Sequence, residues 1–285
     1  MAADRPRCAE AAAAAGDPAA GTAPPAEQWF LVEHPGPWGR DPLWQSGLDP
    51  RAAAALAGWA AAYRGRIVLV RRPGRPGRRT APGRWFRVDA RPGREAVRTG
   101  RVVAERDLVG VLADPDAGEP HGAPLLLVCT HGRHDPCCAV HGRPLAAAAA
   151  GADPEATWEC SHLGGCRFAP ALVLLPHGWV LGRVPPAEVA AVIRAYRAGR
   201  LDPRYLRGRS ALAPAVQAAE VRARAEVGDD RVEAFRVAGV DADGQVRFAD
   251  PDHAVTLRER RVEAGRPLTC AARAPGWQRV FEPDP

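Results

Sequence analysis

The sequence predicts an α/β fold, and three observations lead to this class. Apolar runs typical of buried strands alternate with segments that carry helix start and stop signals. The order strand, loop, helix, strand, strand, strand, helix occurs twice between residues 28 and 199. Beyond residue 200 the pattern changes to one helix followed by strand-like segments, which predicts a small α+β extension.

The first half opens with a predicted strand over residues 28–34, followed by a well-marked helix. Asp49 can cap this helix, Pro50 suits its first position and Gly65 ends it. One apolar face of the helix is formed by Leu56, Trp59, Ala60 and Tyr63. The other elements expected in this half are strands at 67–70, 85–88 and 97–103 and a short helix at 106–114.

The second half repeats this order from Pro124 onward. Its expected strands are 125–128, 157–160, 171–175 and 179–184, and its expected helices are 143–150 and 186–199. We hypothesise that the two halves are pseudo-repeated lobes, of which only the second carries metal ligands. The alternative is that α/β segments resemble one another at this level without a shared topology.

These patterns divide the chain into four parts. They are a flexible N-terminal segment (1–26), an N-terminal α/β lobe (27–118), a second lobe that contains the cysteine-rich loops (119–200) and a C-terminal α+β extension (201–285). In the extension we expect a helix at 216–227, a hairpin formed by 235–240 and 245–248, and a third strand at 254–262.

Composition and charge argue against two classes of function. The net charge is +6, but every basic residue is arginine, and the arginines form no run with interleaved aromatic residues, so we expect no nucleic-acid partner. No apolar stretch approaches the ~20 residues that cross a bilayer, which argues against membrane insertion. Residues 1–26 lack the basic-then-apolar layout of an export signal, so we expect a cytoplasmic protein.

The cysteines are concentrated in one part of the chain. Five of the seven fall between Cys129 and Cys166. A tight cluster in a chain without an export signal fits metal or redox chemistry better than a disulfide framework. Cys270 stands apart from this cluster, and we expect it to be a small buried hydrophobic residue.

Two stretches carry the chemistry, and each follows a predicted strand. The first is Cys-Thr-His-Gly-Arg-His-Asp-Pro-Cys-Cys (129–138), and the second is Cys-Ser-His-Leu-Gly-Gly-Cys-Arg-Phe (160–168). Loops at the ends of neighbouring strands can converge on one point, and thiolates with imidazole suit zinc, copper(I) or iron–sulfur centres. Gly164 and Gly165 allow the second loop to turn sharply and to approach a compact inorganic core with its amide N–H groups.

These stretches resemble the sucrase/ferredoxin-like family. The resemblance runs from about Gln28 to Ala198, with further likeness at 206–209 and 214–220. It implies a thioredoxin-like ferredoxin fold and a [2Fe-2S] cluster held by two cysteines of the first loop and two histidines of a Ser-His-x-Gly-Gly-His stretch. Carried over residue by residue, the ligands are Cys129, Cys138 and His162, with Cys166 in place of the second histidine. A thiolate is a competent ligand, so the resemblance implies a Cys3His cluster.

Neighbouring residues compete for ligand roles. Cys160 lies two residues before His162 and can share its face of a strand, but the spacing from His162 to Cys166 reproduces the ferredoxin pattern, so we prefer Cys166. Cys137 adjoins Cys138 and is expected to face away. The remaining polar residues, His131, Arg133 and His134, are expected in a solvated turn, with Arg133 or Arg167 able to donate hydrogen bonds to cluster sulfur.

The resulting prediction is an electron carrier rather than an enzyme, with another protein as its redox partner. The sequence identifies neither that partner nor an oligomeric state. A structural zinc protein that uses the same Cys3His set is the alternative. A thiol–disulfide oxidoreductase is a second alternative, but it requires a C-x-x-C motif, and here Cys137 and Cys138 are adjacent. No pair of carboxylates is marked for the sugar-cleaving chemistry that half of the family name suggests.

Overall fold

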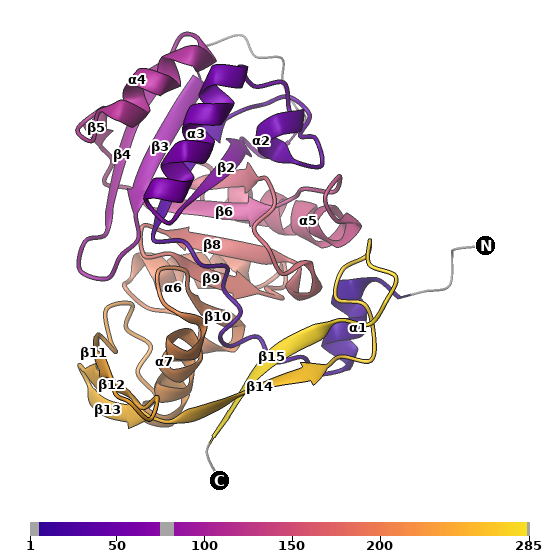
Figure 1. The fold of residues 1–285 in the computed structure, drawn as a ribbon, viewed down its shortest axis with the longest axis vertical. Helices are drawn as coiled ribbons and strands as arrows, with labels where there is room; N and C mark the ends of the chain where they lie inside the picture. Colours follow the sequence, from indigo (N-terminus) through magenta and orange to yellow (C-terminus); the bar gives the residue numbers. More distant parts are fainter. Residues whose placement is uncertain (1–5, 75–82, 284–285) are drawn as a thin grey trace.

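The computed structural model describes residues 6–74 and 83–283, and its central element is a ten-stranded mixed sheet (Figure 1). The strands are β1 (Gln28–Glu33), β2 (Gly65–Arg71), β3 (Gly83–Asp89), β4 (Ala96–Val102), β5 (Glu119–Pro120), β6 (Leu125–Cys129), β7 (Thr157–Cys160), β8 (Ala171–Leu175), β9 (Trp179–Gly182) and β10 (Leu206–Arg209). They are hydrogen-bonded in the order β10-β9-β8-β6-β7-β2-β1-β3-β4-β5.

The sheet contains the same four-strand arrangement twice. In the first half, β1 pairs with β2 in parallel and with β3 antiparallel, and β4 follows antiparallel to β3. In the second half, β6 pairs with β7 in parallel and with β8 antiparallel, and β9 follows antiparallel to β8. This repeated topology is thioredoxin-like and agrees with the hypothesis of two lobes. The lobes are joined where β2 and β7 pair antiparallel.

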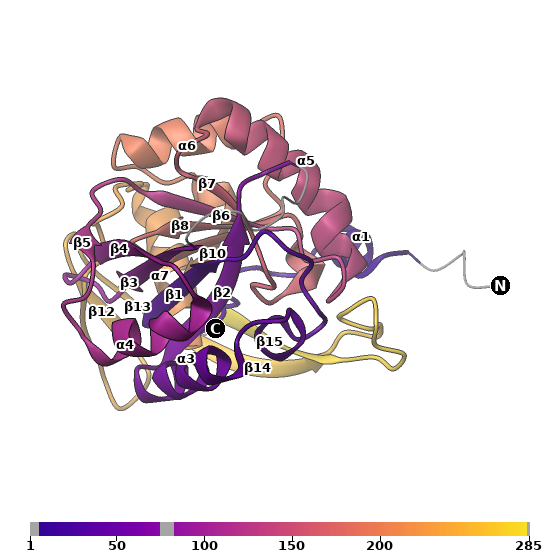
Figure 2. The same ribbon diagram turned by 90° about the horizontal axis from the view of Figure 1, so that it is seen from above.

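Helices cover each lobe separately. They are α2 (Pro42–Gln45), α3 (Pro50–Ala62), η1 (Glu105–Asp107) and α4 (Leu108–Ala113) in the first lobe, and α5 (Pro136–Ala152), η2 (Cys166–Phe168), α6 (Val189–Arg197) and η3 (Pro203–Tyr205) in or after the second. Helices α3 and α4 lie on one side of the molecule in Figure 2, and α5 and α6 lie on the other. Within the described residues, no helix combines the length and the apolar composition that crossing a membrane requires.

Two helices begin with the same signature, an aspartate followed by proline. Asp49 caps α3, because its carboxylate accepts hydrogen bonds from the backbone N–H groups of Arg51 and Ala52. Asp135 caps α5 in the same way, through the backbone N–H of Cys137. The predicted helix at 143–150 is therefore too short at its N-terminus, and the first helical turn contains Cys137 and Cys138.

The cysteines gather in one buried cluster that both lobes share. It combines Trp29 and Val70 of the first lobe with Leu127 and Trp158 of the second. Six cysteines belong to it, namely Cys8, Cys129, Cys137, Cys138, Cys160 and Cys166, and the half-buried Cys270 packs against it. The cysteines thus lie in a buried core to which both lobes contribute.

The N-terminal segment differs from the flexible stretch that the sequence predicts. Residues 8–14 form α1 (Cys8–Ala14), and Cys8, Ala9 and Ala12 of this helix are buried. The helix packs against η2, directly after the second cysteine loop. Its small side chains gave no apolar periodicity, because alanine contributes little to such a pattern.

The C-terminal extension has its own small core and two separate sheets. Its elements are α7 (Pro214–Val227), the sheet β11 (Val237–Val240), β12 (Val246–Ala249) and β13 (Asp252–Val255), and the hairpin β14 (Leu257–Glu263) and β15 (Trp277–Pro283). The single third strand predicted at 254–262 is wrong, because the chain leaves one sheet after Val255 and enters the hairpin at Leu257. Strand β10 also extends the main sheet by pairing with β9.

Candidate metal centre

The two cysteine-rich loops leave the sheet at the same edge. Strands β6 and β7 are parallel, and Cys129 at the end of β6 stands opposite Cys160 at the end of β7. The chain after β6 enters α5, which brings Cys138 back to this edge. After β7 the chain passes through His162 and reaches Cys166, the first residue of η2. The order of the strands therefore brings residues more than twenty positions apart in the sequence to one place.

Four side chains with metal-ligand atoms meet there. The Sγ atoms of Cys129 and Cys138 and a ring nitrogen of His162 all lie within 4.8 Å of one another. The Sγ atoms of Cys138 and Cys166 each lie 3.9 Å from Nδ1 of His162. We call Cys129, Cys138, His162 and Cys166 the candidate metal centre.

His134 adds a fifth ligand atom that the sequence does not single out. A ring nitrogen of His134 lies within 4.8 Å of ligand atoms of both His162 and Cys166. Its ring stacks on that of His162, with centroids 3.6 Å apart and planes 19° apart. His134 lies in a turn, as expected, but it is half-buried and packs on His162. A histidine in a loop of mixed polar residues carries no signal of this orientation.

A buried histidine holds the backbone of the second loop. Nδ1 of His131 accepts a hydrogen bond from the backbone N–H of His162 at 3.2 Å. Nε2 of His131 donates to the backbone carbonyl of Gly39 at 2.8 Å, which fixes the tautomer. His131 is 2% exposed and therefore acts as an internal support rather than as part of a solvated turn.

Glycines permit the close approaches that the loops require. Gly164 and Gly165 have φ angles of +94° and +73°, which L side chains rarely adopt, and they turn the chain from His162 toward Cys166. In α5, a Cβ atom added to Gly142 would collide with the backbone carbonyl oxygen of Cys129. Gly142 thus allows α5 to pack directly on the end of β6.

Replacing Gly142 with alanine is therefore expected to destabilise the fold by about 1–3 kcal/mol, the usual cost of overpacking. In an unstrained helix the same change stabilises by about 0.5–1 kcal/mol. Gly151 lies in the same helix with open space around its Cα, so Gly151→Ala is the matched control and should be neutral or stabilising. Urea unfolding of the metal-free chain measures both free energies. Equal stability of the two variants would contradict this account of the packing.

The thiols are buried and influence one another strongly. Cys129, Cys138 and Cys166 are at most 4% exposed. A hydrogen bond from the Cys138 thiol lowers the pKa of Cys129 and lowers the pKa of Cys166 to about 7, in both cases against the effect of burial. Burial alone would lower the pKa of His162, but the thiolates of Cys129 and Cys166 outweigh it and raise this pKa to about 9. Cys129 and Cys166 are thus poised to deprotonate, as metal ligands must. The Cys138 thiol, which donates to both of them, has a raised pKa and holds its proton while no metal is bound.

Two arginines, the half-buried Arg66 and the buried Arg207, lie near the thiolates. Arg66 donates through Nη2 to the backbone carbonyl of His162 at 2.9 Å, and its buried Nε has no hydrogen-bond partner among the described residues. Arg207 donates to the carbonyl of Gly164 at 3.1 Å, and burial lowers its pKa to about 9, so that it stays charged at neutral pH. Burial also lowers the pKa of Arg66. At both arginines the Cys129 thiolate opposes this lowering of the pKa. Positive charge from Arg66 and Arg207 therefore lies near the thiolates of Cys129 and Cys166.

Other sequence expectations fare differently. Arg167 pairs with Asp17 at 3.6 Å and Arg133 is exposed, and within the described part of the chain neither donates a hydrogen bond to sulfur. Cys160 is fully buried and belongs to none of the ligand groups of the described residues. Cys137 faces away from Cys138, and its Sγ lies 3.4 Å from that of Cys270. Cys270 therefore does not stand alone, contrary to the prediction.

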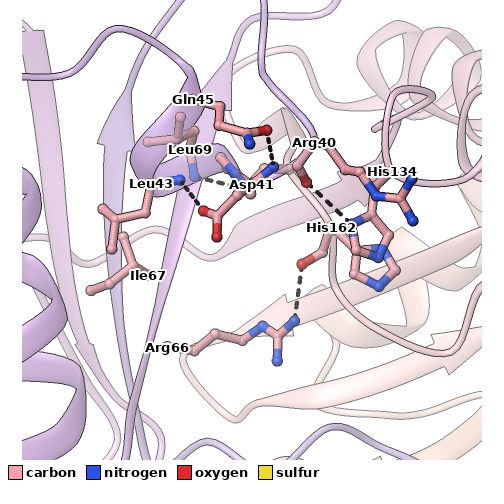
Figure 3. A pocket seen from close by; sticks show the side chains of 11 residues that line it. Arg40, Asp41, Leu43, Gln45, Arg66, Ile67, Leu69, His134 and His162 are labelled. Atoms are coloured by element: carbon pink, nitrogen blue, oxygen red, sulfur yellow. Dashed lines mark hydrogen bonds between the residues drawn. The ribbon is translucent and has the colours of Figure 1, made fainter.

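One side of the candidate metal centre opens into a cavity of about 490 Å³. Its walls come from the segment around α2, from β2 and from the loop after β7 (Figure 3). His134 and His162 lie at this cavity, stacked side by side, while Arg66 approaches the backbone of His162 from another side. The imidazole side of the centre thus faces the cavity, and the sulfur side is enclosed by the core.

The fold and the site together define a thioredoxin-like α/β protein with a cysteine- and histidine-lined candidate metal centre. The chain belongs to the sucrase/ferredoxin-like family, whose family model matches residues 19–208, about two thirds of its length. Comparison with curated protein sequences finds no match.

Comparison with solved structures finds a cysteine-to-serine variant of the thioredoxin-like [2Fe-2S] ferredoxin from Aquifex aeolicus. The identity is 21% and the TM-score is 0.26. The match covers 30% of this chain and 97% of the ferredoxin.

Proposed function

We propose that the chain is a one-electron carrier whose [2Fe-2S] cluster is held by Cys129, Cys138, His162 and Cys166. The observation that carries this proposal is the convergence of the four donors. Cys129 ends β6 and Cys138 lies in the first turn of α5, while His162 and Cys166 follow β7. Membership of the sucrase/ferredoxin-like family supports it.

The donor set fits an iron–sulfur centre. Thiolates are the usual ligands of [2Fe-2S] clusters, and imidazole replaces some of them in known clusters. The donors form two overlapping groups, one with Cys129 and Cys138 and one with Cys166, and His162 belongs to both. Donors spread over two groups suit a centre larger than one ion. When bound, a [2Fe-2S] cluster accepts and donates single electrons.

The residues of the chain supply the surroundings that this chemistry needs. The sulfurs are buried and therefore shielded from water. Arg66 and Arg207 offset the negative charge of the centre, which favours the reduced state and raises the reduction potential. His131 holds the backbone of His162 in place. The cavity lined by His134 and His162 opens at the centre, so we assign it as the side that a redox partner protein approaches.

The same set could hold zinc, and one measurement separates the two cases. Anaerobically purified protein is expected to be coloured, to contain two irons and two acid-labile sulfides per chain, and to give an electron paramagnetic resonance signal after reduction. Iron content, visible absorption and the resonance spectrum measure this. A colourless protein whose zinc is lost in the Cys138→Ala variant would overturn the proposal in favour of a structural zinc site.

A further inference from the structure

A second group of ligand atoms lies next to the candidate metal centre and shares none of its residues. The Sγ atom of Cys137 lies 3.4 Å from that of Cys270, and the Sγ atom of Cys8 lies 3.6 Å from each of them. The carboxylate oxygens of Asp135 lie 3.8 and 3.9 Å from the Cys8 sulfur. All four ligand atoms fall within 4.8 Å of one another. We call these four residues the Cys8–Cys137–Cys270 cluster.

The three sulfurs come from segments far apart in the sequence. Cys8 begins α1, Cys137 lies in the first turn of α5, and Cys270 lies in the loop between β14 and β15. Figure 1 shows this loop, in yellow, beside α1. Cys8 and Cys270 lie outside residues 19–208, the part that the family model matches. The family model therefore does not include the complete cluster.

The cluster is sheltered and its carboxylate is held in position. Cys8, Asp135 and Cys137 are at most 3% exposed, and Cys270 is half-buried. Oδ1 of Asp135 accepts the backbone N–H of Cys137, and Oδ2 accepts that of Cys270, both at 2.9 Å. Each carboxylate oxygen keeps a second lone pair for another partner.

We propose that Cys8, Cys137, Cys270 and Asp135 bind one structural zinc ion. Sulfurs held at about 2.3 Å from one tetrahedral zinc ion lie about 3.8 Å apart, close to the separations in this cluster. A disulfide requires about 2.05 Å, and three sulfurs cannot all pair. A closed set of four protein ligands is the hallmark of structural zinc sites.

The ion ties both terminal regions to the second lobe. A two-stranded hairpin such as β14–β15 has little stability of its own, and α1 is shorter than two full turns. Zinc would anchor both at the first turn of α5.

The test uses the full chain, purified without a metal-binding tag or chelator. Elemental analysis is expected to find one zinc ion per chain. X-ray absorption at the zinc edge, which iron does not disturb, is expected to find three sulfurs at about 2.3 Å and one oxygen at about 2.0 Å. The double variant Cys8→Ala/Cys270→Ala should contain less than about one tenth of the zinc of the wild type and should keep its iron. Cys160→Ala, which removes a buried thiol outside both groups, should keep its zinc.

Three outcomes would overturn the proposal. The first is a wild-type chain that neither contains zinc nor takes it up when zinc chloride is added. The second is a double variant that keeps its zinc. The third is a disulfide between two of the three cysteines, detected by alkylation and mass spectrometry without reduction. Zinc that is lost in Cys138→Ala but kept in the double variant would instead occupy the candidate metal centre, so failure of this proposal is distinguishable from failure of the electron-carrier proposal.

Discussion

The Cys166→Ala variant is expected to contain less than about one tenth of the iron of the wild type, whereas Cys160→Ala should contain as much iron as the wild type. The Sγ atom of Cys166 lies 3.9 Å from both ring nitrogens of His162, and we have proposed it as the fourth ligand. Loss of residues that merely support ligands already costs about 10–100-fold in metal affinity, and loss of a ligand costs at least as much. Iron and sulfide analysis of the purified variants measures the effect.

Cys160→Ala is a close control, because it removes an equally buried thiol six positions away. Cys160 stands opposite Cys129 in the sheet but belongs to none of the ligand groups in the described residues. Retention of iron by Cys166→Ala together with its loss from Cys160→Ala would show that Cys160 is the fourth ligand.

Two further variants test what replaces a missing thiolate. His134 lies within 4.8 Å of the ligand atoms of His162 and Cys166 and could take the empty place. Residual iron in Cys166→Ala should then vanish in the double variant Cys166→Ala/His134→Ala. Cys166→His should keep the iron, because the family pattern that this chain resembles has histidine at this position. Unchanged circular dichroism would show that the variants fold.

The His162→Cys variant is expected to keep the cluster at a reduction potential lower by on the order of 100 mV. A thiolate carries a negative charge and a neutral imidazole does not, so the exchange makes the addition of an electron less favourable. Two imidazole ligands raise such potentials by at least about 250 mV relative to four cysteines, and one is expected to contribute roughly half. Voltammetry of the two proteins measures the difference.

The same exchange is expected to remove a dependence of the potential on pH. Reduction adds negative charge to the centre and raises the pKa of a ligating imidazole. Between the pKa values of the oxidised and reduced forms, reduction takes up a proton, so the potential falls by up to about 59 mV per pH unit as the pH rises. The wild type should show this slope between about pH 6 and pH 9, and His162→Cys should be flat. His134→Gln, which changes the stacked ring, is the control and should keep the slope.

A flat wild-type potential over this range would argue against ligation by His162. Complete loss of colour in His162→Cys would show that the geometry of the site, and not only its charge, depends on the imidazole.

The elements of the core could be predicted where local pattern and tertiary environment agree. Residues 157–160 and 171–175 form strands with the predicted bounds, and both strands are fully buried. The continuous apolar run at 171–175 is typical of a strand that is buried on both faces. The start of α5 was available from Asp135 and Pro136, the same signature that marks α3. It was missed because the cysteines that follow were assigned to a loop. Strand β10 was not predicted, because the buried residues Arg207 and Arg209 occupy positions at which a buried strand usually has apolar residues.

The sequence by itself determined which cysteines and histidines form the candidate metal centre and approximately where they meet. The strand–loop–helix–strand order places Cys129 and His162 at the ends of adjacent parallel strands, and this follows from short-range patterns. Only the tertiary structure decided which other groups join them. Arg66, Arg207 and His134 reach the candidate metal centre, and Cys8 meets Cys270, through packing between segments distant in the chain. Such contacts depend on how whole elements are buried against one another, and no local periodicity records them.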